Sequence, residues 1–179
     1  NKDLFSKFQN KIVHVIVDHH TGIPKRRREK LARARLRHQR NKIASGFNEL
    51  ALNDKDILIL SDLDEVIKPQ KLVDFVRSKK YNDHSRFGVE MKAFFYDFYH
   101  QRKKPWYAAV FFSYAYYKSC KKELADFRKG TYFLHCRNWR KQKYILQNGG
   151  WHMGWFGDIE FIKNKMQSFG HYKEFKGLL

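Results

Sequence analysis

Ile57-Leu58-Ile59-Leu60-Ser61-Asp62-Leu63-Asp64-Glu65 is the stretch that decides the fold, because an apolar run ends there in a group of carboxylates. A short run rich in β-branched residues predicts a buried strand. Ligands of open α/β sheets collect at the carboxyl ends of strands, where Asp62 and Asp64 stand. Two carboxylates suit a Mg²⁺ or Mn²⁺ ion that takes its other ligands from water and substrate phosphates. The alternative is a polar turn before a helix that begins near Pro69.

The segments on either side of this strand predict an α/β fold with a mixed sheet flanked by helices. We expect a parallel core that carries the acidic turn, followed by an antiparallel extension, in one domain spanning residues 1–179. Gly149 and Gly150 predict a break before a glycine-rich loop at 151–157. The expected strands are 11–18, 57–60, 87–99, 108–117 and 131–136, and the expected helices are 24–50, 69–79 and 158–169. The buried side of the first helix is expected to carry Leu36, Ile43, Phe47 and Leu50.

Composition narrows the possible classes of protein. A hydrophobic content of 42% and an aromatic content of 17% exclude a disordered chain, and no apolar run reaches the length of a membrane span. The net charge of +19 favours polyanionic partners, which include nucleic acid, nucleotide phosphates and an acidic membrane surface. Cys120 and Cys136 leave either one bridge or two thiols open.

The start of the chain and its glycosylation signals bear on the compartment. The chain begins at Asn1 without an initiator methionine, which leaves a removed signal or anchor open. It contains no acceptor site for N-glycosylation, which favours a cytoplasmic enzyme of a bacterium or virus over one of the Golgi lumen.

Four segments together resemble glycosyltransferase family 17, the β-1,4-mannosyl-glycoprotein β-1,4-N-acetylglucosaminyltransferases. The Asp-x-Asp turn within 60–66 is common to many nucleotide-sugar transferases, whereas its combination with Gly150-Trp151-His152 is more specific. The other two segments are 39–43, before the acidic strand, and 168–171, near the end.

The resemblance implies the GT-A fold and an inverting, metal-dependent transfer of N-acetylglucosamine from a UDP-sugar. The acceptor would be a hydroxyl of a mannose-containing glycan, and the new linkage would be β. The family has further sequence before this region, including an early strand, so we expect part of the nucleotide pocket to be missing or built differently. The segment around Glu90 diverges from the family, so acceptor specificity does not carry over.

The resemblance also implies roles for residues around the turn. Asp64 is expected to bind Mn²⁺ or Mg²⁺ directly, and Asp62 to bind it through water or to contact the ribose and sugar hydroxyls. His171 is the candidate third ligand or diphosphate contact. Arg40 and Asn41 are candidates for contacting the nucleotide. Structural alternatives remain for these residues: Glu65 as a helix-start carboxylate, His171 as an exposed side chain and Arg40 as part of a solvated basic face.

An inverting transfer needs one general base near the acceptor hydroxyl. Glu160 is the first candidate, Asp158 the second and Glu90 the third. Acidic residues are also common at helix starts because they interact favourably with the helix dipole. Helix stabilisation is therefore an equal interpretation of Asp158 and Glu160.

The Gly-Trp-His segment is the candidate sugar-binding element. Trp151 and Trp155 flank His152, and indole rings stack on the apolar faces of sugars. His152 is expected to bind a hydroxyl or a phosphate. Either tryptophan could instead be a buried core residue.

Two other classes of protein compete with the transferase. A nucleic-acid-binding module would explain the charge, the basic residues 25–42 and the abundant aromatics, but it assigns no task to the acidic turn. A metal-dependent nuclease would use both the positive charge and the carboxylates of the acidic turn. We favour a UDP-sugar and a glycan or glycoprotein as partners, with peripheral association with an acidic membrane, and we do not expect nucleic acid.

Overall fold

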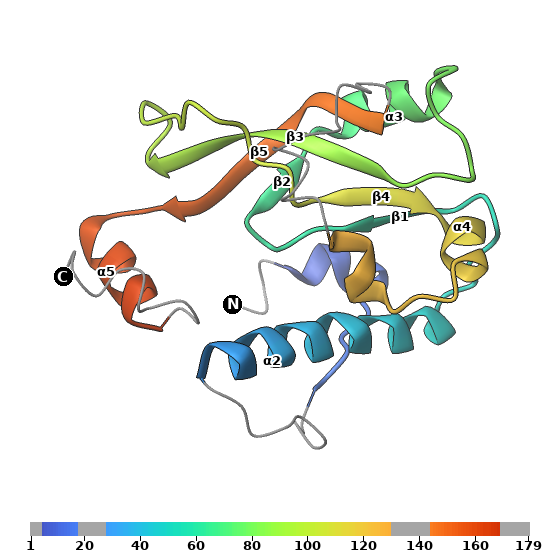
Figure 1. Ribbon diagram of the computed structural model, residues 1–179, viewed down its shortest axis with the longest axis horizontal. Coiled ribbons are helices and arrows are strands. Elements are labelled where there is room, and N and C mark those ends of the chain that lie inside the picture. The colour runs from blue at the N-terminus through green and yellow to red at the C-terminus, as the bar shows by residue number, and fades with distance from the viewer. Residues whose placement is uncertain (1–4, 18–27, 130–143, 169–179) are drawn as a thin grey trace. The chain divides into compact units, whose positions relative to one another are not determined.

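The computed structural model describes residues 5–17, 28–129 and 144–168 (Figure 1). The chain divides into two compact units, Asn1–Leu52 and Asn53–Leu179, which we describe separately. The expected single domain over residues 1–179 stays a prediction. The predicted strand at 131–136 and the candidate His171 lie outside the described residues.

The first unit contains the 3₁₀ helices η1 (Ser6–Lys11) and η2 (Ala44–Glu49) and the helix α2 (Arg28–Ile43). The predicted strand at 11–18 is wrong over residues 12–17, which pair with no strand. Instead, Val13 and Val15 pack closely on η2, where a Cβ on Gly46 would lie 2.9 Å from Val15 Cγ2 and 3.2 Å from Val13 Cγ1. The apolar side chains of this segment therefore pack on a short 3₁₀ helix and do not form a strand.

The predicted buried stripe on the first helix is also largely wrong. Leu36, Ile43 and Leu50 are all exposed, between 42% and 45%. A stripe that buries well needs three or four apolar residues in every two turns, whereas Leu36 and Ile43 are seven positions apart. The helix itself forms where it was predicted, although it is shorter.

The second unit is built on one five-stranded mixed sheet, which confirms the expected fold class. The order of the described strands is β1-β4-β3-β5-β2, and among them only β3 and β5 are parallel neighbours. The expected parallel core around the acidic turn is wrong, because β1 is an edge strand antiparallel to β4. The strands are β1 (Ile57–Leu60), β2 (Glu65–Ile67), β3 (Phe87–Tyr96), β4 (Val110–Ser113) and β5 (Ile145–Phe156).

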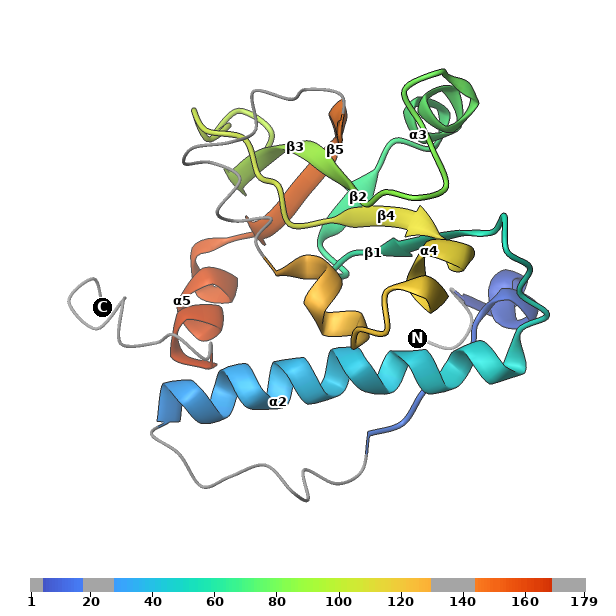
Figure 2. The same ribbon diagram turned by 45° about the vertical axis from the view of Figure 1, so that its right-hand side comes forward.

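The acidic turn joins the two opposite edges of this sheet. β1 and β2 stand at the two ends of the strand order, yet only residues 61–64 separate them. Four strand spacings of about 4.8 Å would put the edges of a flat sheet about 19 Å apart. Five extended residues reach only about 17 Å. The sheet therefore curls towards half a barrel (Figures 1 and 2), and the carboxylates cross the gap between its edges.

The helices of the second unit are α3 (Pro69–Arg77), α4 (Tyr114–Ser119), η3 (Leu124–Arg128) and α5 (Ile159–Ser168). Helix α3 confirms the predicted helix, and its Phe75 packs edge-on against Phe87 and Phe111 in the core. The predicted strand 108–117 ends early, at Ser113. The Ser113 hydroxyl accepts the Tyr116 amide at 3.0 Å and so begins α4. Among the described residues, none of these helices has the length and apolarity to cross a bilayer.

The predicted break at Gly149 and Gly150 is wrong, because β5 continues through both residues. A Cβ on Gly150 would lie 2.4 Å from the Val66 carbonyl oxygen, and one on Gly149 would lie 2.7 Å from Val89 Cγ1. These glycines therefore let neighbouring strands approach, and they do not end a strand. The segment that follows them is a strand with two faces and not a loop.

Candidate active site

The two most distinctive segments of the sequence lie side by side. Strand β2 begins directly after the acidic turn, and its Glu65 pairs with His152 of β5. The Met153 amide donates to the Asp64 carbonyl oxygen at 2.8 Å. His152 Nε2 lies 3.9 Å from Asp64 Oδ1. The acidic turn and the Gly-Trp-His segment thus form one site.

A buried polar cluster holds the turn in place. The Glu65 carboxylate accepts the Trp106 indole N–H at 2.7 Å, Arg128 Nη2 at 2.9 Å and the Asp62 amide at 2.8 Å. Burial raises the pKa of Glu65, and Arg128 and the Trp106 indole N–H oppose that rise. Glu65 lies in β2, so its interpretation as a helix-start carboxylate is wrong. Its buried carboxylate holds the acidic turn in place through the hydrogen bond from the Asp62 amide.

Arg128 connects this buried cluster to the exposed carboxylates. Its side chain is 6% exposed, and its Nη1 lies 2.7 Å from Asp62 Oδ1. Asp62 is 44% exposed, so it faces solvent beside a fixed positive charge. Asp64 is 35% exposed and lies 3.5 Å from Lys165 Nζ of α5, which also donates to the Gly154 carbonyl oxygen. Each of the two partly exposed carboxylates therefore lies beside a cation, Asp62 beside Arg128 and Asp64 beside Lys165.

The His152 ring is mostly buried and stacks on a neighbouring indole. It stacks on Trp106 with ring centroids 4.2 Å apart and planes 14° apart. Burial, opposed by Asp64, lowers the pKa of His152, which favours the neutral imidazole. A neutral imidazole beside a carboxylate can bind a metal or accept and donate hydrogen bonds.

The donor atoms fit a divalent cation that keeps much of its water. Within residues 5–17, 28–129 and 144–168, no three His, Cys, Asp or Glu side chains form a metal-binding group. Mg²⁺ commonly takes only one or two protein carboxylates and completes its shell with water and phosphate oxygens. Asp64 would hold such an ion, with Asp62 and His152 Nε2 beside it.

Trp151 lies on the face of β5 opposite to its neighbour His152, because adjacent side chains alternate along a strand, whereas a register shift against β3 interrupts this alternation before Trp155. Each ring is half-buried next to a lysine: Lys68 Nζ lies 4.8 Å from the Trp151 ring centroid, and Lys165 Nζ lies 5.5 Å from that of Trp155. They do not flank His152 in a loop, because the segment is a strand. Trp155 remains near the site through Lys165.

The candidate bases lie in different places. Asp158 caps α5, since its Oδ1 accepts the Phe161 amide at 2.8 Å. Glu160 is highly exposed in the first turn of α5, 4.0 Å from Lys163. Glu90 accepts the Tyr107 hydroxyl at 2.8 Å and the Asn148 amide at 3.2 Å, and burial and Glu90 raise the pKa of Tyr107 to about 12. The assignment of the base stays a prediction.

Two predicted residues belong to the first unit, and three residues of the site were not predicted. Arg40 and Asn41 lie on α2 in the first unit, and their contact with a nucleotide stays a prediction. Sequence reasoning missed Trp106, Arg128 and Lys165. Each stands among many similar aromatic or basic residues, so no spacing distinguishes them. Pro105 next to Trp106 was the one weak signal, because it marks a turn.

Gly154 offers a test of how tightly this site is packed. An added Cβ would lie 2.6 Å from His152 Cε1 and 3.1 Å from Asp64 Oδ2. We expect Gly154→Ala to displace the ring and to lower kcat/KM about 10- to 100-fold, since small misplacements are costly. The matched control is Gly88→Ala, where nothing lies within 4 Å. Equal activity of both variants would show that the close packing of His152 has no role.

The model of glycosyltransferase family 17 matches residues 1–177. No curated protein and no solved structure matches the chain.

Proposed function

Because the chain belongs to glycosyltransferase family 17, we propose that the site at Asp64 and His152 transfers N-acetylglucosamine from a UDP-sugar to a glycan hydroxyl. Family membership makes the chain a glycosyltransferase with a sugar donor and a glycan acceptor. The observation that carries the finer proposal is the 3.9 Å separation of Asp64 Oδ1 and His152 Nε2, which joins segments far apart in the chain. It also favours the transferase over a nucleic-acid-binding module.

The proposed reaction is an in-line displacement with inversion. The acceptor oxygen attacks the anomeric carbon, the bond from that carbon to the diphosphate oxygen breaks, and UDP leaves with the electron pair. A carboxylate takes the acceptor proton, with Glu160 preferred to Asp158 and Glu90. Lys165, which is 26% exposed beside Asp64, offers positive charge to the leaving diphosphate, and the buried Arg128 holds Asp62 in position.

Mn²⁺ or Mg²⁺ at Asp64 would supply Lewis-acid neutralisation of the diphosphate when bound. Lys165 lies 3.5 Å from Asp64 Oδ2, so it competes with the ion for this carboxylate. On this proposal Asp62 contacts the ribose or metal-bound water, while its other interaction with Arg128 holds it in position.

The proposal is tested by ligand-dependent melting and by turnover of a panel of UDP-sugars. At about 100 times the dissociation constant, a ligand stabilises the folded protein by about 2.7 kcal/mol. For a chain of this size that raises the Tm by about 5–10 °C. We expect this rise with UDP plus Mn²⁺, its loss with a chelator, and turnover of UDP-N-acetylglucosamine above other donors. A flat melting response together with no turnover of any donor would contradict the proposal.

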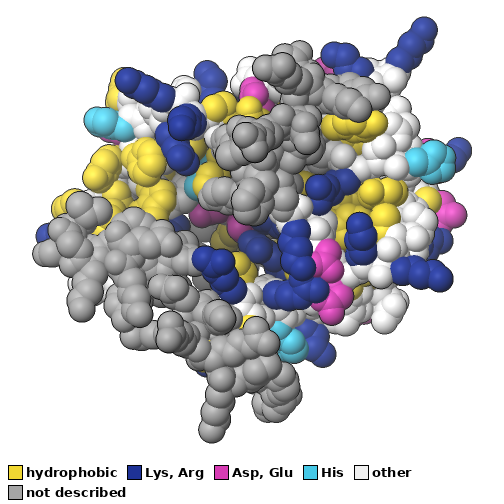
Figure 3. Space-filling view, viewed as in Figure 1, with side chains coloured by type: hydrophobic (Ala, Val, Ile, Leu, Met, Phe, Trp, Pro, Cys, Tyr) yellow, Lys and Arg dark blue, Asp and Glu magenta, His cyan; other side chains and the backbone are white. Residues whose placement is uncertain are grey.

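We also propose peripheral association with an acidic membrane through an aromatic patch, defined as Tyr96, Phe98, Tyr99 and Phe161. Phe98 is 60% exposed and Tyr99 is 94% exposed, and Figure 3 shows hydrophobic side chains gathered over the end of β3. The Gly157 amide donates to the Tyr96 carbonyl oxygen at 3.0 Å and so joins the two segments of the patch. The exposed cations at 102–104 begin three positions after Tyr99 in the sequence. Aromatic rings beside basic side chains fit the interface of an anionic bilayer.

Vesicle sedimentation checks this association. We expect the protein to bind vesicles that contain anionic lipid more strongly than zwitterionic ones. The double variant Phe98→Ser/Tyr99→Ser should lose about 10-fold in affinity, whereas Phe5→Ser/Phe8→Ser changes two other exposed rings, in the first unit, and should not. Equal losses in both double variants would exclude the patch as the contact.

A further inference from the structure

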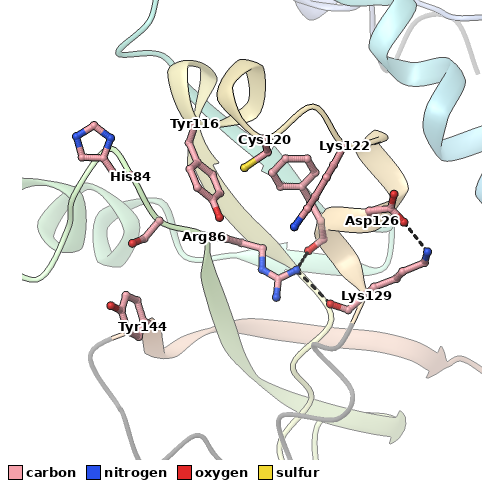
Figure 4. A pocket seen from close by; sticks show the side chains of 10 residues that line it. His84, Arg86, Tyr116, Cys120, Lys122, Asp126, Lys129 and Tyr144 are labelled. Atoms are coloured by element: carbon pink, nitrogen blue, oxygen red, sulfur yellow. Dashed lines mark hydrogen bonds and ion pairs between the residues drawn. The ribbon is translucent and has the colours of Figure 1, made fainter.

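A second charged cavity lies in the same unit as the active site. It has a volume of about 680 Å³, which suits a ligand of the size of a sugar phosphate or a nucleotide. It lies between the start of β3 and the segment from α4 to η3 (Figure 4). Among the described residues, its lining includes the basic residues His84, Arg86, Lys122 and Lys129, but only one acidic residue, Asp126.

Arg86 occupies the centre of this cavity, and it donates hydrogen bonds to backbone carbonyl oxygens. Its Nη1 donates to the carbonyl oxygens of Phe127 at 2.5 Å and Lys129 at 3.1 Å. Carbonyl oxygens fix the guanidinium but leave its charge in place. Burial lowers the pKa of Arg86, which reflects the cost of holding that charge away from water. Within the described part of the chain, no carboxylate forms an ion pair with Arg86.

Lys122 adds a second positive charge at the same point. Figure 4 shows its ammonium directed towards the Arg86 guanidinium. Asp126 does not lie between them, because it pairs with Lys129 at 2.6 Å. The sequence of residues 130–143 contains no aspartate or glutamate that could supply the missing charge. Two cations directed at one another in a half-buried cavity are stabilised when an anion lies between them.

The chain segment 127–129 separates this cavity from the active site. The carbonyl oxygens of Phe127 and Lys129 hold Arg86 on one side, whereas the Arg128 side chain reaches Asp62 and Glu65 on the other. The cavity therefore neighbours the acidic turn, and none of its described lining residues belongs to that turn.

We propose that this cavity is a second binding site, separate from the acidic turn, for a ligand that carries a phosphate or diphosphate group. Arg86 and Lys122 bind its phosphoryl oxygens, and the hydroxyls of Tyr116 and Ser85 line the same cavity. A planar guanidinium beside a mobile ammonium is a usual combination for phosphate. The ligand is either a phosphorylated sugar or a nucleotide. The proposal goes beyond the transfer reaction and does not depend on it.

Calorimetric titration with inorganic pyrophosphate, UDP and mannose 6-phosphate tests the site. The wild-type chain should bind pyrophosphate, with an affinity that falls as salt is added. Lys122→Glu should weaken this binding about 10-fold or more, while the control Lys121→Glu makes the same charge change on an exposed neighbour outside the cavity. Both lysines are exposed, so neither variant is expected to impair folding. Absence of pyrophosphate binding, or equal losses in the two variants, would overturn the proposal.

Two further measurements identify the ligand and separate this proposal from the transferase proposal. If mannose 6-phosphate displaces pyrophosphate, a phosphorylated sugar is the ligand; if UDP alone displaces it, a nucleotide is. Asp64→Asn should leave pyrophosphate binding unchanged while it lowers sugar transfer. Loss of pyrophosphate binding in Asp64→Asn would place the phosphate at the acidic turn and overturn the second site.

Discussion

Asp64→Asn is expected to lower kcat/KM for sugar transfer by about 100- to 1000-fold. The substitution removes the half-exposed carboxylate next to His152, and neutralising the departing diphosphate contributes several kcal/mol to the transition state. The fold should survive, because an asparagine side chain has nearly the same shape as an aspartate and the buried anchor of the turn is Glu65. Steady-state kinetics over a range of Mn²⁺ concentrations, with circular dichroism on the same sample, would measure both effects.

The control for this experiment is Asp74→Asn on α3. Asp74 is an exposed carboxylate whose side chain accepts a hydrogen bond from Gln70 at 2.8 Å. It should keep activity within about twofold, since it lies in no part of the site. Activity of Asp64→Asn within about threefold of Asp74→Asn would contradict the central role of the acidic turn.

Arg128→Met is expected to lower the free energy of unfolding by about 3–5 kcal/mol. Arg128 and Glu65 are almost completely buried as a pair, so removal of the cation leaves an uncompensated carboxylate in the interior. For a chain of this length the Tm should fall by about 10 °C. Thermal unfolding followed by circular dichroism would measure this loss directly.

A second substitution shows whether the unpaired charge causes the loss. Glu65→Gln in the Arg128→Met background replaces the stranded carboxylate by a neutral amide that still accepts the Trp106 indole N–H, so part of the lost Tm should return. Arg77→Met, at the exposed end of α3, is the control and should change the Tm by less than about 2 °C. If Arg128→Met has the same Tm as Arg77→Met, the buried cluster does not hold the turn.

Local patterns predicted the elements whose driving force is local. The apolar run 57–60 forms β1 with the expected bounds, and Pro69 starts α3 as expected. The glycines of β5 misled the prediction, because a glycine needed for close strand contact has the same appearance in a sequence as one that ends a strand. The parallel core was wrong for a related reason. Which strands pair depends on contacts between distant segments, and no local pattern encodes them.

The sequence by itself determined the mixed α/β class, the acidic turn and the family, because each rests on residues close together or on motifs in a fixed order. Tertiary structure alone decided that Glu65 is a buried anchor, that Arg128 links it to Asp62, and that Trp106 stacks on His152. These partners lie between 46 and 66 positions apart in the chain. They meet because four residues must bridge the two edges of the sheet, so the sheet curls and brings its distant side chains to one point.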